Sequence, residues 1–319
     1  MLQTQNVAIV GAGNMGHGFA AHFVIQDKDV TLIDHRQPNL DEAEAQIRDV
    51  VAFLREEGLT ELSPDDVVDA IDFTLDTAAG VDGVDLVVET VSEDLDTKHE
   101  VFADFAPAAP DEALLASNTS GIPITDIAKG VPEYAERVVG CHWWFPPYLL
   151  PTVEVIRGEL TSDETLERME AFVESVDRIP LTVEKDAPGF LWNRIQHALF
   201  REAIHIAEEG IASLEDVNRA IRDGYAIRTA AIGPIETIDI AGLDLTQTVG
   251  DDLYPHLCDD DETSDLFDEY LERGRGGIED GAGFFEYDED PSGITQARDE
   301  QVMAIRRALT GEAGLGADE

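Results

Sequence analysis

The segment from Asn6 to Asp34 constrains the fold of this 319-residue chain more than any other part. An apolar run at 7–10 predicts a strand buried on both faces, and it leads directly into Gly-Ala-Gly-Asn-Met-Gly at 11–16. Helix-like spacing of apolar residues follows at 14–26, and a second strand is expected at 29–33. This order predicts a Rossmann-type α/β fold that binds a dinucleotide.

The glycine-rich turn has a mechanical reason at each position. Gly11 permits the tight turn, Gly13 lets the backbone approach a pyrophosphate, and Gly16 lets the helix pack closely on the strand. Free N–H groups at the helix start, which includes Asn14 and Met15, then hold the anion.

The acid at the end of the second strand indicates which dinucleotide is bound. Asp34 lies 18 residues after Gly16, where its carboxylate can accept hydrogen bonds from a ribose diol. The same charge would repel a 2′-phosphate, so the sequence favours NAD over NADP. Arg36, two residues further on, leaves NADP as the alternative.

Strand and helix patterns alternate as far as residue 183, and only helical patterns follow. Ser63, with Pro64 at the first helical position, predicts one helix start, and a long helix is expected to start within 185–194. We therefore expect a Rossmann NAD-binding domain at 1–184 and a helical substrate and dimerisation domain at 185–319. The further strands are expected at 72–75, 84–88, 113–116, 137–142, 152–156 and 179–183.

Ligands of such folds sit beyond the carboxyl ends of the parallel strands. Glu89 ends the fourth expected strand, and Ser-Asn-Thr-Ser at 117–120 ends the fifth, where the nicotinamide half of the cofactor should lie. A turn rich in local hydrogen bonds explains the second segment equally well.

His142 and Glu154 leave two neighbouring strands, 12 residues apart. A hairpin-like return would bring the carboxylate to the imidazole, raising its basicity and fixing its tautomer for general-base catalysis. A surface salt bridge, or two unrelated groups, is the alternative.

The formal charge is −47, from 68 acids against 21 bases. Disorder is disfavoured, because 43% of the residues are hydrophobic and lie in periodic runs. We expect a halophilic protein whose self-repulsion is screened in molar salt. The same charge disfavours nucleic acid and anionic membranes as partners.

Other features predict a cytoplasmic protein without a metal. No apolar run approaches a membrane span, and the first strand leaves no room for a signal peptide. Cys141 and Cys258 lack metal-ligand spacing, so reduced thiols are expected. His197 and His205 share a helix face but have no third ligand in suitable spacing.

Taken together, a series of motifs resembles the L-3-hydroxyacyl-CoA dehydrogenase family across residues 5 to about 287. The resemblance implies an NAD-binding domain, a helical domain that forms a homodimer, and an active site in the cleft between them. The motifs are, in order, GAGNMG, VVETVSED, SNTSG, GCHWWFPP with VEVI, KDAPGFLWNR, GPIETIDIAGLD and GAGFFEY.

The resemblance also implies roles for individual residues. Its reaction would be proton removal from the 3-hydroxyl of a short-chain 3-hydroxyacyl-CoA, such as 3-hydroxybutyryl-CoA, with hydride passing to NAD. The implied roles are His142 as general base with Glu154 as its partner, Ser120 and Asn193 on the substrate oxygen, Asn118 near the nicotinamide, and Glu89 and Lys98 lining the cofactor site.

Three departures from the family pattern leave alternatives open. Phe145 stands where the family commonly has Asn, which motivates a non-catalytic NAD-binding protein as one alternative. The region 40–66 offers only Arg48 and Arg55 where family members carry a lysine-rich hairpin. Arg228 is typical of the branch that includes gulonate and carnitine dehydrogenases and lambda-crystallin, and it could pair a free substrate carboxylate. A surface ion pair is the other interpretation of Arg228.

Overall fold

The computed structural model describes residues 4–288 and 290–310. These residues divide into two compact units, one up to Arg194 and one from Ile195 onward.

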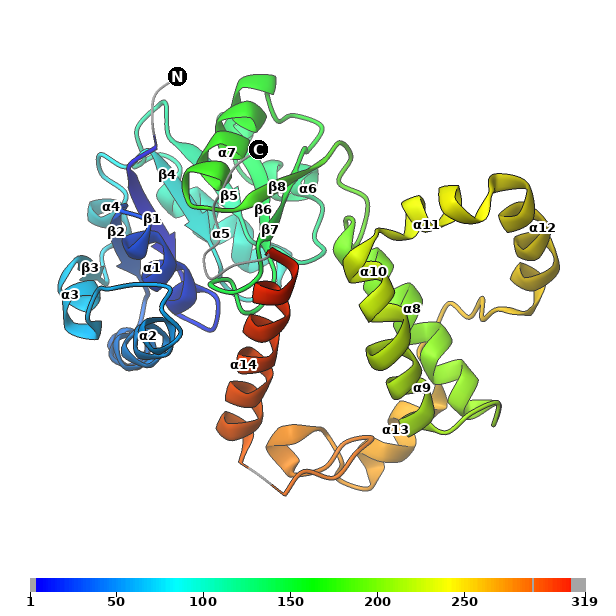
Figure 1. Cartoon of the computed structure of the whole chain (residues 1–319). Coiled ribbons are helices and arrows are strands. Elements are labelled where there is room, and N and C mark those ends of the chain that lie inside the picture. The colour runs from blue at the N-terminus through cyan, green and yellow to red at the C-terminus, as the bar shows by residue number, and fades with distance from the viewer. Residues whose placement is uncertain (1–3, 289, 311–319) are drawn as a thin grey trace. The chain divides into compact units, whose positions relative to one another are not determined.

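The first unit is built on one eight-stranded sheet with the order β3-β2-β1-β4-β5-β6-β7-β8 (Figure 1). All neighbouring strands run parallel except β6 and β7, which are antiparallel. The predicted strands are confirmed, each to within two residues at either end. Their bounds are β1 Asn6–Val10, β2 Asp29–Ile33, β3 Ile71–Thr74, β4 Leu86–Glu89, β5 Leu114–Ser117, β6 Val138–Trp143, β7 Thr152–Ile156 and β8 Ile179–Val183.

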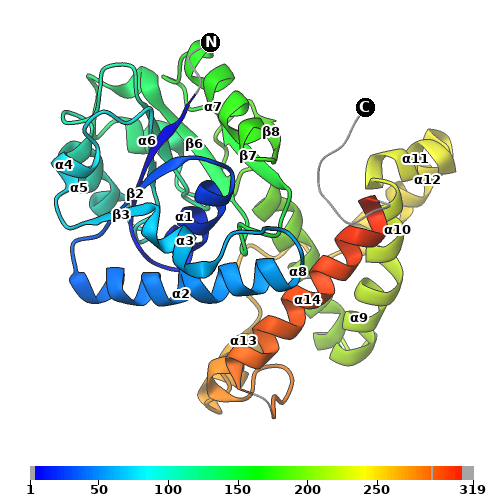
Figure 2. The same cartoon turned by 60° about the vertical axis from the view of Figure 1, so that its left-hand side comes forward.

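Helices flank this sheet, and α1 packs against both α2 and α3 (Figure 1 and Figure 2). The predicted helix start at Ser63 is confirmed, because its hydroxyl accepts from the Asp66 N–H at 3.1 Å and Pro64 is the first helical residue. The helices are α1 Gly16–Ile25, α2 Gln37–Glu56, α3 Pro64–Asp69, α4 Thr77–Gly80, α5 Leu95–Phe105, α6 Ile124–Ala128 and α7 Asp163–Ser175.

Apolar side chains bury the sheet, as the continuous apolar strands predict. Phe23 of α1 packs edge-on against Trp143 of β6 and Phe172 of α7, with ring centroids 5.6 and 5.3 Å apart. A separate cluster joins Phe102 and Phe105 of α5 to the strands. These cores hold the carboxyl ends of the strands in fixed register, and the candidate site residues lie there.

The second unit is helical in its described residues, apart from short bridges near Ala282. The long helix expected to start within 185–194 begins only at Trp192, because Gly189 and Phe190 have left-handed backbones with φ of 76° and 46°. Gly242, at φ 95°, separates α11 from α12. The bounds are α8 Trp192–Glu208, α9 Leu214–Ala220, η2 Ile221–Tyr225, α10 Ala226–Ala231, α11 Pro234–Ala241, α12 Leu243–Leu253, η3 Tyr254–His256, α13 Asp265–Glu272, η4 Ile278–Asp280 and α14 Pro291–Thr310.

None of the helices within residues 4–288 and 290–310 is long and apolar enough to cross a membrane.

Candidate active site

The glycine-rich loop is packed at two of its glycines and open at the third. A Cβ at Gly16 would lie 1.9 Å from the carbonyl oxygen of Gly11, and one at Gly11 would lie 2.7 Å from that of Thr90. At Gly13 a Cβ would meet nothing within 4 Å. The loop therefore packs tightly against itself and against the residue that follows β4, and it leaves space at Gly13, which fits the close approach of a dinucleotide pyrophosphate.

Asp34 closes this loop from the end of β2, with 8% of its surface exposed. One carboxylate oxygen accepts from the Ala12 N–H at 3.0 Å. The other accepts from the Arg36 N–H at 3.0 Å and from Nδ2 of Asn39 at 2.9 Å. The sequence predicts Asp34 as a ribose acceptor, but it gives no sign that Asp34 also braces the glycine loop or that Asn39 supports it.

Replacing Asp34 with Ala should weaken NAD binding by about 10- to 100-fold and narrow the preference over NADP. The change removes a charged acceptor for the ribose diol, worth about 1.5–3 kcal/mol, which weakens NAD binding. It also removes the charge that repels the 2′-phosphate of NADP. Titration of both dinucleotides against wild type and variant measures this. Asp29→Ala, an exposed acid at the start of the same strand, is the matched control. A wild type that prefers NADP would show that Arg36 decides the choice.

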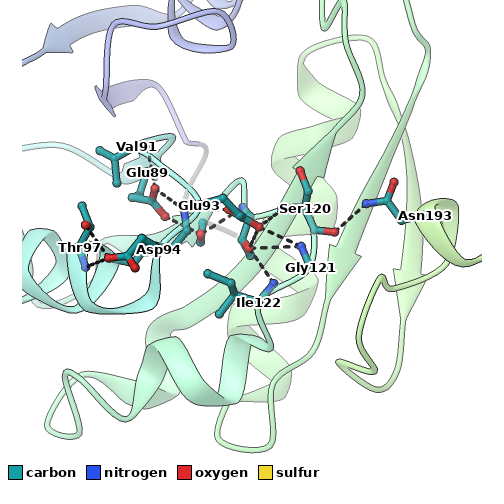
Figure 3. A network of polar contacts seen from close by, with 12 residues as sticks. Glu89, Val91, Glu93, Asp94, Thr97, Ser120, Gly121, Ile122 and Asn193 are labelled. Atoms are coloured by element: carbon teal, nitrogen blue, oxygen red, sulfur yellow. Dashed lines mark hydrogen bonds and ion pairs between the residues drawn. The ribbon is translucent and has the colours of Figure 1, made fainter. Parts of the chain in front are cut away.

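Glu89 and Lys98 form a buried ion pair of 2.7 Å, with 0% and 1% of their side chains exposed. Glu89 also accepts from the Ser117 hydroxyl at 2.5 Å and from the Val91 N–H at 2.7 Å. Both its oxygens are thus satisfied, as a buried charge requires. Glu89 thus joins the carboxyl end of β4 to that of β5 through Ser117 and to α5 through Lys98, and it lies beside the loop that follows β5 (Figure 3).

The loop after β5 is held by contacts from distant parts of the first unit. The Asn118 side-chain oxygen accepts from the Trp143 N–H at 2.8 Å, so this loop is tied to the residue that follows His142. Asn193 donates from Nδ2 to the Ser120 carbonyl at 2.8 Å (Figure 3). The structure therefore brings Ser120 and Asn193 together.

His142 and Glu154 face each other as a register pair of the antiparallel strands β6 and β7. Nδ1 of His142 lies 2.6 Å from Oε2 of Glu154, and Glu154 is fully buried. The N–H groups of Leu191 and Trp192 donate to the other carboxylate oxygen at 2.7 and 2.9 Å. The pairing that the spacing predicts is thus present as a short contact. Two backbone N–H donors, which the sequence does not indicate, orient the carboxylate.

These donors set the charge of the pair. Burial opposes ionisation of Glu154, but hydrogen bonds from His142 and from the two backbone N–H groups outweigh it and lower the pKa of Glu154. An ionised carboxylate only accepts, so Nδ1 of His142 must donate. In the neutral imidazole this leaves Nε2 as an acceptor, which is the form a general base needs.

An indole pair lies beside the Glu154 carboxylate. Trp144 and Trp192 stack with ring centroids 3.9 Å apart, and Nε1 of Trp144 donates to Glu154 at 3.3 Å. Phe145, the departure from the family pattern, is 46% exposed.

Other candidates lie in the second unit. Arg228 on α10 is exposed, and its guanidinium lies over the Tyr225 ring at 5.9 Å. Nδ1 or Nε2 of His205, the Cys258 thiol and an Asp260 oxygen lie within 4.8 Å of one another, although the two partners of His205 are more than fifty residues away in sequence. A hydrogen bond from the thiol to Asp260 at 3.3 Å accounts for that contact, and the absence of a metal stays a prediction.

Comparisons with known proteins agree with this geometry. Residues 6–187 match the NAD binding domain of 3-hydroxyacyl-CoA dehydrogenase, and residues 189–287 match its C-terminal domain. The chain is 34% identical over 308 residues to 5-formyl-3-hydroxy-2-methylpyridine 4-carboxylate 5-dehydrogenase of Mesorhizobium japonicum, covering 96% of this chain and 99% of the relative.

Two other relatives act on different substrates by name. One is a probable 3-hydroxybutyryl-CoA dehydrogenase of Deinococcus radiodurans, 34% identical, covering 88% of this chain and 99% of the relative. The other is an L-carnitine dehydrogenase of Streptomyces coelicolor, 36% identical, covering 75% of this chain and 74% of the relative.

Among solved structures, one of the same 5-formyl-3-hydroxy-2-methylpyridine 4-carboxylic acid 5-dehydrogenase, described as an NAD+-dependent dismutase, matches with a TM-score of 0.89 at 33% identity. The match covers 97% of this chain and 100% of that one. Both domain matches, the glycine loop and the buried dyad point the same way: the chain is an NAD-dependent oxidoreductase that belongs to the 3-hydroxyacyl-CoA dehydrogenase family.

Proposed function

We propose that this protein oxidises the hydroxyl group of a small hydroxy acid, with His142 as the general base. The observation that carries the proposal is the 2.6 Å contact between His142 and Glu154 at neighbouring strands of the dinucleotide-binding unit. A protein that had lost its catalytic activity would have no need of a buried carboxylate held by two backbone donors.

Each residue of the site has a part in this chemistry. Nε2 of His142 takes the hydroxyl proton, and Glu154 stabilises the imidazolium that forms. The Gly13 loop would hold NAD, which would supply the acceptor for the hydride that leaves the carbon bearing the hydroxyl. Ser120 and Asn193 orient the substrate oxygen, and in the reverse direction the protonated His142 acts as the acid.

The sequence alone favours a CoA thioester as the substrate. The surface charge of α2 and α3 favours a free acid instead. Arg48 is already paired with Glu44 and Asp65, so two nearby carboxylates offset its charge. The same two helices carry many further acids, which would repel CoA: Asp41, Glu42, Asp49, Glu56, Asp66 and Asp69.

The relatives support both substrate classes. Those that act by name on a pyridine carboxylate or on carnitine support a free acid, for which Arg228 is the candidate carboxylate partner. The 3-hydroxybutyryl-CoA relative supports a CoA thioester as the second candidate.

Side-by-side kinetics distinguish these candidates. The panel is 3-hydroxybutyrate, gulonate, carnitine and 5-formyl-3-hydroxy-2-methylpyridine 4-carboxylate against 3-hydroxybutyryl-CoA, each with NAD. We expect the largest kcat/KM for one of the free acids. A larger value for the CoA thioester overturns that assignment. NAD binding without turnover of any of the five would support the non-catalytic alternative, whereas turnover that disappears in His142→Ala removes it.

We also propose a cytoplasmic homodimer joined through the helical unit. Helix α8 has no buried residue, although Ile195, Leu199 and Phe200 are apolar and 37–60% exposed. Exposed apolar side chains continue on α11 and α12, where Ile240 is 74% exposed. Such a surface is typical of a subunit interface. Light scattering should give twice the chain mass in molar KCl, and a monomer would contradict the proposal.

A further inference from the structure

Glu93 receives no role from the sequence, yet it is the centre of the polar network after β4 (Figure 3). Its Oε1 accepts three hydrogen bonds from consecutive residues of the loop that follows β5. The donors are the Thr119 hydroxyl at 2.6 Å, the Ser120 N–H at 2.8 Å and the Gly121 N–H at 3.1 Å. One carboxylate oxygen therefore fixes the whole turn on which Ser120 lies.

The charge of Glu93 is held in place from its other side. Lys98 lies 3.4 Å from Oε2 of Glu93, and its 2.7 Å pair with buried Glu89 fixes its own position. Burial opposes ionisation of Glu93, but the loop donors and Lys98 outweigh it, and the pKa of Glu93 is lowered. An ionised acceptor makes hydrogen bonds about twice as strong as a neutral one.

Ser120 is consequently held at its backbone and open at its side chain. Glu93 binds its N–H, and Asn193 binds its carbonyl at 2.8 Å. Within the described residues no bond to the Ser120 hydroxyl is observed, and the residue is exposed. The backbone of Ser120 is therefore fixed, and its hydroxyl remains available to a substrate.

We propose that Glu93 is a positioning residue for the reaction, acting through Ser120. It sets where the Ser120 hydroxyl meets the substrate oxygen, and it does not itself touch substrate. The inference rests on the proposed function, because it needs Ser120 as a substrate contact. A displacement of about 1 Å at such a contact costs about 10²-fold in rate.

A double-mutant cycle tests whether Glu93 acts through Ser120. We expect Glu93→Ala to lower kcat/KM about 30- to 100-fold, and Glu93→Gln, which keeps one acceptor oxygen, to lower it less. In a Ser120→Ala background, Glu93→Ala should lower kcat/KM by less than about threefold, because the hydroxyl that Glu93 positions is gone. Fully additive losses would overturn the proposal.

The neighbouring acid is a matched control. Asp94 accepts two hydrogen bonds from Thr97 and caps α5, but no bond joins it to the loop at 119–121 (Figure 3). Asp94→Ala should lower the melting temperature and leave kcat/KM within about twofold. An equal loss of kcat/KM in the Asp94 and Glu93 variants would mean that general destabilisation explains both.

Amide hydrogen exchange separates this inference from the proposed function. The Ser120 and Gly121 amides should exchange at least about tenfold faster in Glu93→Ala than in wild type and keep their wild-type rates in Asp94→Ala. Unchanged exchange in Glu93→Ala overturns the role of Glu93, whatever the substrate. Faster exchange in a protein without turnover would instead overturn the proposed function.

Discussion

Replacing Glu154 with Gln is expected to lower kcat by about 10²–10⁴-fold, with NAD affinity nearly unchanged. The wild-type carboxylate accepts from His142, Trp144, Leu191 and Trp192. Glutamine has nearly the same shape but no charge, so it cannot stabilise the imidazolium that forms at His142. Because only one end of the glutamine amide can accept, the side chain cannot satisfy both Nδ1 of His142 and the N–H groups of Leu191 and Trp192.

A second Glu-to-Gln substitution in the same unit controls for this change. Glu170 is a half-buried residue of α7 whose carboxylate accepts from the Thr182 hydroxyl. We expect Glu170→Gln to keep kcat within about twofold of wild type. Steady-state kinetics, NAD titration and melting curves of both variants make the comparison. A loss below about threefold in a folded Glu154→Gln protein would show that Glu154 does not support His142.

The same variant should also change the acid stability. Because the pKa of Glu154 is lowered in the folded protein, its carboxylate stabilises the fold above the ordinary value of 4.5. That contribution is lost progressively as the pH falls from 4.5 through the lowered pKa. Glu154→Gln should lack this part of the acid transition, so its stability below pH 4.5 should fall less steeply than that of the wild type.

The pairing of His142 and Glu154 was predictable because it follows from strand register. Both residues lie on adjacent strands, and the antiparallel return fixes which residues oppose each other. The buried strands and the Ser63 helix cap were predictable for a similar reason, since each is encoded by neighbouring residues. Local patterns therefore predict the frame of the sheet and the acids at its carboxyl edge.

Contacts between loops could not be read from local patterns. Asn193 and Ser120 are 73 residues apart, and no periodicity relates them. Glu93 looks like one more acid among 68 until the turn at 119–121 folds against it. The late start of α8 depends on a left-handed Phe190, a backbone state that this residue type rarely adopts.

Stability and NAD affinity should both rise as KCl is increased from 0.1 M towards the molar range. The chain carries 68 acids against 21 bases, and individual cations are shared, as Arg157 is between Asp163 and Glu184. Self-repulsion of a charge of −47 is on the order of tens of kcal/mol at 0.1 M, and shortening the Debye length from about 10 Å to about 3 Å removes about half or more of it. The melting temperature should therefore rise by at least about 10 °C.

An osmolyte separates screening from general stabilisation. Sucrose at matched osmolality strengthens burial because it is excluded from the protein surface, but it screens no charge. Melting curves and NAD titrations in both series should show a raised melting temperature in each and a tighter NAD complex only in KCl. Equal effects of sucrose and KCl on NAD affinity would remove electrostatics as the cause. A melting temperature and activity that are already maximal in dilute buffer would mean that the acids are ordinary surface residues, because repulsion among them would then have no measurable consequence for the fold.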